Sequence, residues 1–368
     1  GQAYWLTGLN FMTSTFYMKE LPKWVEKFNA KGNVKKYLEG KWEPLLPADK
    51  YRFSDENNNY EGRLGNAKAP KFPYDLSQVL ELSRNYDLIK ETPFGNSLLV
   101  DIVVEAIGAE SLGQDEFTDM LSVSFSSSDY IGHQYGTEAM ELEDSYYRLD
   151  RDLARLFNAL DEKVGKGEYL AFLTADHGAA YNPGFLNAHS IPGGTIDRDQ
   201  IKEELDSLID MSWGNSDWVE YIGSNQIFLN HSSIVQAKIK LRDAQDHAMK
   251  LLLALPNIEK VYTSYSLMTG QMTEDMGERV QKGFNQKWGG DLVYLLKPHY
   301  FSGRVLGTTH GSGYTYDTHV PLLWMGWNIP NGESWKKVNI TDIVPTISSL
   351  INVNRPSGAF GDIIEMKP

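Results

Sequence analysis

Three short stretches of the chain carry aspartate and histidine side chains at spacings that suit a metal site. They are Ser-Ser-Asp-Tyr-Ile-Gly-His with Asp129 and His133, Thr-Ala-Asp-His-Gly with Asp176 and His177, and Gly-Thr-Thr-His-Gly-Ser with His310. Carboxylates and imidazoles are common zinc ligands in proteins. Together the five residues predict two adjacent divalent metal ions, expected to be zinc, and paired metals are a common device of phosphoryl chemistry.

The spacing within each stretch limits how its side chains converge. Asp129 and His133 lie four positions apart, and we expect a tight turn after a strand to direct both at one ion. Asp176 and His177 are adjacent, so on an extended chain they point in opposite directions unless the chain turns between them. The sequence does not determine the direction of His310. A lone aspartate is usually a turn former or a helix cap, but three such clusters together favour a metal site.

The elements that must position these residues alternate between strand and helix. Residues 120–125 form a short apolar run before Asp129, and residues 169–174 form another before Asp176. Between them, apolar side chains over 142–160 recur with the period of an amphipathic helix. Strand, helix and strand make a βαβ unit with parallel strands. Both motifs then follow the carboxyl ends of strands, where α/β sheets bind ligands.

The rest of the chain predicts one large α/β domain over 1–368 with a mostly parallel central sheet flanked by helices. Residues 1–75 indicate an irregular excursion with a polar loop at 54–59, and residues 191–290 an inserted cap-like segment. Further elements are expected: helices at 96–109, 198–211, 233–255 and 276–286, strands at 291–296 and 320–325, and a last helix capped by Thr341 with Pro345 in its first turn.

Composition excludes several classes of protein. The 49 acidic and 35 basic residues give a net charge of −14, so the basic footprint needed for double-stranded nucleic acid is missing. A small anionic substrate still fits, because bound metal ions reverse the charge locally. The chain has no cysteine, which excludes disulfides and thiolate zinc sites. No apolar run reaches membrane-spanning length, no signal-peptide pattern is present, and the oligomeric state is not readable.

The order of these motifs resembles the alkaline phosphatase superfamily. Asp-x-x-x-His, Thr-Ala-Asp-His-Gly and Thr-His-Gly occur in that order and are followed by Thr-Asp-Ile-Val-Pro-Thr at 341–346. The segments 13–18, 126–133 and 316–321 resemble the PafA-type branch, and the similarity covers essentially the whole chain. The resemblance implies an alkaline-phosphatase-like fold, hydrolysis of small phosphate monoesters and a periplasmic or secreted location.

The resemblance also implies roles for individual residues. Asp129, His133 and His310 would hold the first zinc, and Asp176 and His177 would hold part of the second. The family further uses a nucleophilic Thr or Ser, another Asp ligand, and an Asn, Lys and Arg that grip the phosphate. This chain offers no matching residues for these. We expect them upstream of this sequence, so that the chain is an N-terminally incomplete, C-terminal portion of a phosphatase and inactive or nearly so by itself.

Three other functions fit part of the pattern. A phosphodiesterase or nucleotide pyrophosphatase of the same superfamily would share the zinc ligands and differ in its phosphate grip. A non-catalytic module that binds metal or phosphate would explain the missing nucleophile. A hydrolase-like scaffold without metal is the third alternative. A sulfatase does not fit, because its modified cysteine is impossible in a chain without cysteine.

Overall fold

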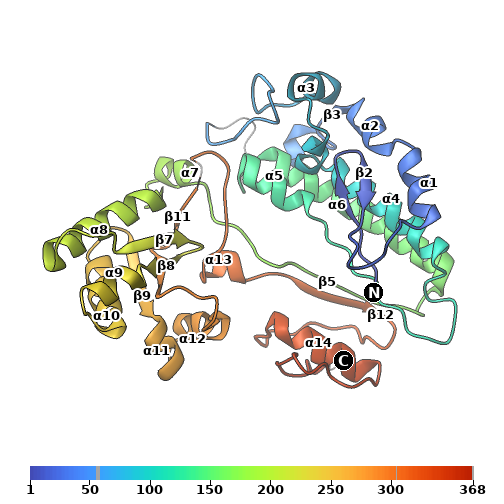
Figure 1. The fold of residues 1–368 in the computed structure, drawn as a ribbon. Coiled ribbons are helices and arrows are strands. Elements are labelled where there is room, and N and C mark those ends of the chain that lie inside the picture. The colour runs from blue at the N-terminus through green and yellow to red at the C-terminus, as the bar shows by residue number, and fades with distance from the viewer. Residues whose placement is uncertain (55–58, 304, 367–368) are drawn as a thin grey trace. The chain divides into compact units, whose positions relative to one another are not determined.

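The computed structural model describes residues 1–54, 59–303 and 305–366, and helices and strands occur along the whole chain (Figure 1). Two compact units are present. The larger comprises Gly1–Asp101, Ser124–Asp152 and Asp176–Val320, and the smaller comprises the remaining segments. All five candidate metal ligands belong to the larger unit. The mixed α/β class predicted from the sequence is confirmed, whereas the predicted domain boundaries stay predictions.

The first part of the larger unit contains short helices and strands joined by stretches without regular structure, and the predicted irregular excursion over 1–75 stays a prediction. Aromatic residues give these elements a core: Trp42 is fully buried and packs against Phe72, Tyr74 and Tyr135. Residues 55–58 of the predicted polar loop lie outside the described residues. The elements are β1 (Trp5–Thr7), β2 (Asn10–Met12), α1 (Lys23–Ala30), α2 (Asn33–Leu38), β3 (Lys41–Trp42), η1 (Ala48–Lys50), β4 (Tyr74–Asp75), α3 (Leu76–Ser83) and η2 (Tyr86–Glu91).

Three helices then lead to the metal-ligand motifs. The helices α4 (Phe94–Ala109) and α6 (Met140–Leu160) confirm those predicted over 96–109 and 142–160, and α6 is followed by η3 (Asp161–Gly165). Between them lies α5 (Ser127–Tyr135), which the sequence analysis did not predict. The predicted strand at 120–125 is not formed, and Met120 is 79% exposed. A strand needs a hydrogen-bonded neighbour, and the described residues place none beside this run.

The smaller unit contains a ladder of two strands. The predicted strands at 169–174 and 320–325 are confirmed as β5 (Leu170–Thr174) and β12 (Leu322–Gly326), but they pair with each other in antiparallel register. The predicted parallel pairing of 120–125 with 169–174 is therefore wrong. Among the described residues, parallel pairing joins β6 (Gly194–Thr195) to β11 (Tyr300–Phe301) in the larger unit. Apolar runs indicate strands but do not determine which strand each one pairs with.

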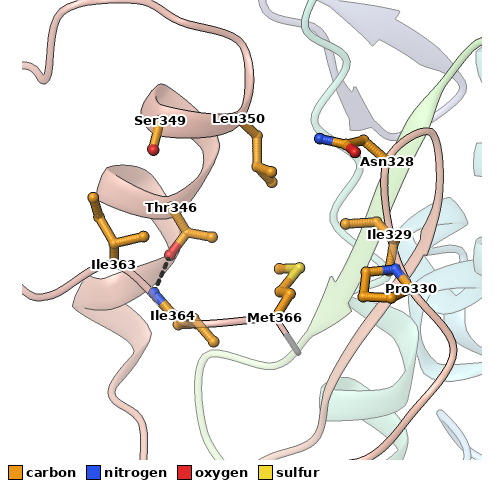
Figure 2. Close-up of a pocket in the computed structure, with 9 residues that line it drawn as sticks. All are labelled: Asn328, Ile329, Pro330, Thr346, Ser349, Leu350, Ile363, Ile364 and Met366. Atoms are coloured by element: carbon orange, nitrogen blue, oxygen red, sulfur yellow. Dashed lines mark hydrogen bonds between the residues drawn. The ribbon is translucent and has the colours of Figure 1, made fainter. Parts of the chain in front are cut away.

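The C-terminal part of the smaller unit surrounds a hollow of about 530 Å³ (Figure 2). Its walls come from residues 328–330, from α14 (Ile343–Leu350) and from residues 363–366. The backbone N–H of Ile364 donates to Thr346 Oγ1 at 2.9 Å and joins the last two walls. Pro345 lies in the first turn of α14, as predicted. The predicted cap at Thr341 is wrong. Asn339 instead forms a capping box with Asp342 at the start of η4 (Ile340–Asp342).

The segment predicted as an insertion, 191–290, forms helices and three strands of a four-stranded antiparallel sheet, and these three strands were not predicted. The fourth strand, β10, confirms the strand predicted at 291–296. The strand order is β7-β8-β10-β9. The predicted helix over 233–255 is divided, because Lys238 adopts a left-handed backbone conformation with φ 59°. The elements are α7 (Pro183–Ala188), α8 (Arg198–Trp213), β7 (Val219–Gly223), β8 (Gln226–Leu229), α9 (His231–Gln236), α10 (Leu241–Leu253), β9 (Ile258–Thr263), α11 (Ser264–Thr269), α12 (Asp275–Gly283) and β10 (Leu292–Leu296).

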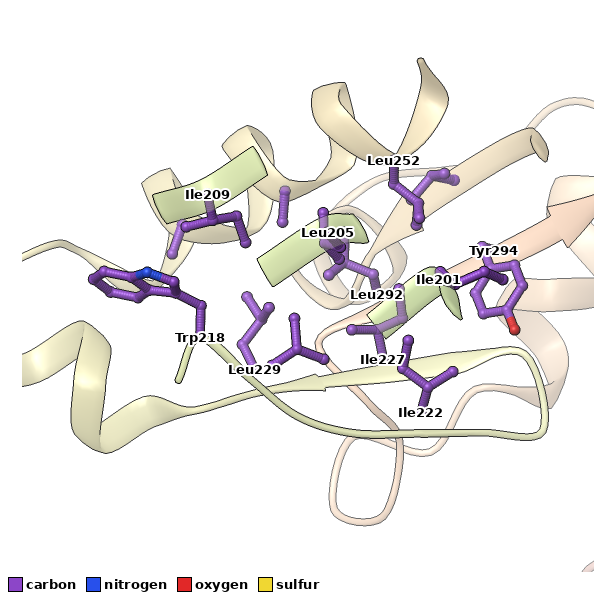
Figure 3. Close-up of a cluster of buried hydrophobic side chains, with 14 of the residues drawn as sticks. Ile201, Leu205, Ile209, Trp218, Ile222, Ile227, Leu229, Leu252, Leu292 and Tyr294 are labelled. Carbon is purple, nitrogen blue, oxygen red and sulfur yellow. The ribbon is translucent and has the colours of Figure 1, made fainter. Parts of the chain in front are cut away.

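One apolar face of α8 provides much of the core of this segment. Ile201, Leu205 and Ile209 lie one helical turn apart and point toward strand residues that include Ile227 and Leu292 (Figure 3). Their spacing places all three on the same side of the helix, as the helical pattern over 198–211 predicted. Among the described residues, no helix is long and apolar enough to cross a bilayer.

Candidate metal centre

The helix α5 positions the first two candidate ligands. Asp129 and His133 lie four residues apart in this helix, which places them one turn apart on the same face. His133 Nε2 lies 3.4 Å from Asp129 Oδ1. The expected tight turn after a strand is therefore wrong, although the expected convergence is observed. A helix produces it directly, because residues i and i+4 are neighbours on its surface.

The chain that follows β5 positions the next two. His177 Nε2 lies 3.9 Å from Asp129 Oδ1 and 3.5 Å from Asp176 Oδ2, so the chain turns between Asp176 and His177 and does not splay them apart. Gly178 follows, and its backbone N–H donates to the carbonyl of Asp317 at 2.7 Å. A side chain at position 178 would collide with the carbonyl oxygen of Tyr316, so glycine is required for this close approach.

His310 completes the cluster from a loop between β11 and α13 (Thr315–Thr318). Its Nε2 lies 3.5 Å from Asp129 Oδ1. Its ring stacks on that of His177, with the ring centroids 3.3 Å apart, and lies 5.0 Å from that of His133. Three segments that are far apart in the sequence therefore bring their side chains to one place.

Asp129 Oδ1 is the common point of this arrangement. The Nε2 atoms of His133, His177 and His310 lie 3.4, 3.9 and 3.5 Å from it. Zinc bonds of about 2.0–2.1 Å in a tetrahedral site put ligand atoms about 3.3 Å apart. The ligand atoms of Asp129, His177 and His310 also lie within 4.8 Å of one another. The donor types and separations therefore fit a divalent cation.

Hydrogen bonds orient two of the imidazoles. His133 Nδ1 lies 2.9 Å from the carbonyl oxygen of Thr308, and His177 Nδ1 lies 2.8 Å from that of Gly178. A carbonyl oxygen only accepts hydrogen bonds, so each Nδ1 carries the proton and donates it. In the neutral ring this leaves the Nε2 lone pair available as a metal ligand, which is the arrangement commonly found around metal-binding histidines.

The electrostatic environment also favours metal binding by His310. Burial, together with the neighbouring His177, lowers the pKa of His310 below its ordinary value, although the Asp129 carboxylate acts in the opposite direction. Because a metal ligand must be deprotonated, a lowered pKa keeps this imidazole available to a cation down to lower pH. The side chain of Asp176 is 87% exposed, which makes it the most accessible of the five.

Two supporting residues were missed by the sequence analysis. Asn182 is fully buried, and its side chain donates to the carbonyl of Gly307 at 2.5 Å and accepts from the N–H of Gly184 at 2.7 Å. Asp317 is also buried and accepts hydrogen bonds from the loop that follows His310. An asparagine directly before a proline indicates a helix cap, but no local pattern points to Asp317.

Known proteins resemble this chain over nearly all of its length. It is 41% identical over 364 residues to "Alkaline phosphatase PafA" of Elizabethkingia meningoseptica, covering 98% of this chain and 66% of that protein. It is 38% identical over 370 residues to a Myroides odoratus protein named "Calcium-transporting ATPase", covering 99% and 67%. The chain thus spans about two thirds of the length of these relatives.

A solved structure and a family match agree with this likeness. The crystal structure of wild-type alkaline phosphatase PafA superposes with a TM-score of 0.92 at 40% identity, covering 98% of this chain and 69% of that one. The alkaline-phosphatase-like fold expected from the sequence is therefore confirmed. Residues 7–312 match the type I phosphodiesterase / nucleotide pyrophosphatase family. The chain belongs to the type I phosphodiesterase / nucleotide pyrophosphatase family.

Proposed function

We propose that this chain carries the metal site of a zinc-dependent enzyme that hydrolyses phosphate esters, with small phosphate monoesters as preferred substrates. The convergence of three imidazoles on one carboxylate oxygen of Asp129 supports the proposal most strongly. The family description and the relative named as an alkaline phosphatase support the same chemistry.

The proposal assigns the five ligands to two ions. Asp129, His133 and His310 hold the first, and Asp176 and His177 contribute to the second. His177 Nε2 lies 3.9 Å from Asp129 Oδ1, so donors for both ions stand side by side. The assignment predicts that the loss of His133 weakens the binding of the first ion more than that of the second. A single ion shared by Asp129, His177 and His310 is the alternative that the separations of their ligand atoms also allow.

Bound zinc would supply Lewis-acid stabilisation for the charge on a phosphoryl group and for the attacking and leaving oxygens. The residues of this chain then act by orientation. The carboxylate of Asp129 keeps negative charge at the centre of the cluster, and the hydrogen bonds of His133 and His177 keep their Nε2 atoms directed at it. None of the five ligands is a hydroxyl nucleophile, and the predicted lack of a nucleophile in this chain stays a prediction.

Zinc content and ester hydrolysis together test the proposal. After equilibration with zinc and removal of excess metal, the chain is expected to retain zinc, and His310→Ala is expected to retain less. A wild-type chain that retains no zinc would overturn the metal assignment. With p-nitrophenyl phosphate, turnover by the wild-type chain above that of His310→Ala would show that the expected lack of a nucleophile is wrong.

A phosphodiesterase is the second candidate, favoured by the match to a family named for phosphodiesterases and nucleotide pyrophosphatases. The rate with p-nitrophenyl phosphate relative to bis-p-nitrophenyl phosphate separates the two activities. Tight zinc binding without turnover of either ester would favour the non-catalytic metal-binding alternative instead.

The resemblance to periplasmic and secreted phosphatases also leads us to propose such a location. Fractionation of producing cells tests it, and recovery of the protein in the cytoplasmic fraction alone would contradict it.

A further inference from the structure

The loop that carries His310 is held by one buried carboxylate. Asp317 is 3% exposed, and its Oδ2 accepts from Gly311 N at 3.1 Å, Ser312 N at 2.7 Å and Ser312 Oγ at 2.6 Å. The donors belong to the two residues directly after His310. Three hydrogen bonds to one oxygen leave this part of the loop little freedom to turn, because charged acceptors make the stronger hydrogen bonds.

The same residue reaches the second histidine of the cluster. The backbone carbonyl of Asp317 accepts from Gly178 N at 2.7 Å, and Gly178 is the neighbour of His177. Asp317 therefore connects, through its side chain, to the loop after His310 and, through its backbone, to the segment after His177. These are the two imidazoles whose rings stack on each other.

The burial of the Asp317 carboxylate lowers the stability of the fold. Its Oδ1 is buried and has no hydrogen-bond partner among the described residues. A buried carboxylate with an unpaired oxygen is destabilising, since its water shell is lost and only partly replaced.

A second anchor holds the other end of the loop. Arg279 in α12 donates to the carbonyl of Gly313 at 2.8 Å and to Thr318 Oγ1 at 3.0 Å. It also pairs with Asp275 one turn away. Arg279 thus fixes the loop where it returns to α13, while Asp317 fixes the residues next to the imidazole.

We propose that Asp317 is a positioning residue of the metal site, which sets the direction of His310 and links it to the segment of His177. The inference rests on the proposed metal-binding function. It predicts that Asp317→Asn weakens zinc binding by about 10- to 100-fold, the usual effect of removing a group that orients a metal ligand. Without metal, the same variant should exchange the amide hydrogens of residues 311 and 312 faster.

Two further variants separate positioning from folding. Asp206→Asn is the matched control, because Asp206 in α8 also accepts backbone N–H bonds, from Trp218 at 2.9 Å and Val219 at 2.8 Å. It should lower the melting temperature and leave zinc affinity unchanged. Ser312→Ala removes the 2.6 Å bond from its hydroxyl to Asp317, together with the 3.3 Å bond that this oxygen accepts from the N–H of Tyr314, and leaves the two backbone bonds to Asp317 in place. It should weaken zinc binding by a smaller factor than Asp317→Asn, which keeps the test open if Asp317→Asn does not fold.

Zinc affinity is measured by competition with a fluorescent chelator, and exchange is followed by mass spectrometry of the metal-free chain. Faster exchange at 311 and 312 together with weaker zinc binding supports the inference. Unchanged exchange, or faster exchange with wild-type zinc affinity in both loop variants, overturns it. If the wild-type chain does not bind zinc, the proposed function is overturned and this inference with it. A wild-type chain that binds zinc, with variants that bind it equally well, overturns this inference alone.

Discussion

The metal cluster and the core of the 191–290 segment are held together by different forces. In the core, side chains such as Leu205 and Ile227 are fully buried and contact apolar neighbours. In the cluster, polar side chains remain partly exposed and are oriented by hydrogen bonds that they donate to backbone carbonyls such as that of Thr308. Hydrophobic burial does not depend on the exact direction of a side chain, whereas a metal site needs each ligand atom to point at the ion. Stability and metal binding should therefore respond to different substitutions.

The largest expected effect is the loss of metal binding in Asp129→Ala, because three imidazoles face this one carboxylate. Removing outer-shell partners already weakens metal binding about 10- to 100-fold, so loss of a ligand should cost at least about 100-fold. Chelator competition measures the change. Asp150→Ala in α6 removes an exposed helical carboxylate and serves as the control. Wild-type zinc affinity in Asp129→Ala would contradict the central place of this residue.

For Leu205→Ala we expect a loss of stability without a loss of zinc affinity. Leu205 is 0% exposed, and truncation of a buried leucine lowers the free energy of unfolding by about 2–5 kcal/mol. Urea unfolding followed by tryptophan fluorescence measures this. Met211→Ala in the same helix, where the side chain is 82% exposed, should have little effect. If Leu205→Ala lowered zinc affinity of the folded chain as strongly as its stability, the two regions would not be independent.

Asn182→Ala tests a residue that should affect both stability and metal binding. Its amide bonds the carbonyl of Gly307 and caps α7, so its loss leaves buried groups unpaired at a cost of about 1–3 kcal/mol. Because Gly307 begins the loop of His310, zinc affinity should fall as well. Thermal melting and chelator competition give the two readouts. Asn187→Ala, an exposed position in the same helix, is expected to change neither.

The smallest expected effect is a pH dependence from His247 in α10. Burial, with the nearby charge of Lys250, lowers the pKa of His247, whose ring packs on Trp213 with centroids 4.6 Å apart. The unfolded chain then binds more protons between the folded pKa and the usual value of about 6.5. This contribution to stability is present above about pH 6.5 and is lost as the pH falls through the folded pKa.

His247→Phe keeps a ring against Trp213 and removes the titration. The decrease in the free energy of unfolding between about pH 8 and about pH 5 should therefore be smaller in this variant than in the wild type. Zinc binding is not involved, so the measurement is made on metal-free chain. An equal decrease in both proteins would show that His247 does not contribute to acid sensitivity.

Much of the helical structure was predictable because helix periodicity is local. The apolar positions over 142–160 and 198–211 lie on one face of α6 and of α8, as their spacing requires. Strand pairing was not predictable. The run at 120–125 looks like a strand but has no partner in the described residues, and β5 pairs with a strand far along the chain. In the four-stranded sheet, the strand at 291–296 was predicted and the other three were missed, because short strands give weak signals between long helices.

The sequence by itself determined the chemical types at the candidate site, since aspartate and histidine at 129, 133, 176, 177 and 310 can be read directly. Only the tertiary structure decided that the three imidazoles meet at Asp129 Oδ1 and that α5, not a turn, aligns Asp129 with His133. It also decided that Asp317 holds the loop beyond His310. The physical reason is that side-chain type and periodicity are local properties, whereas a common meeting point depends on the contacts between distant segments.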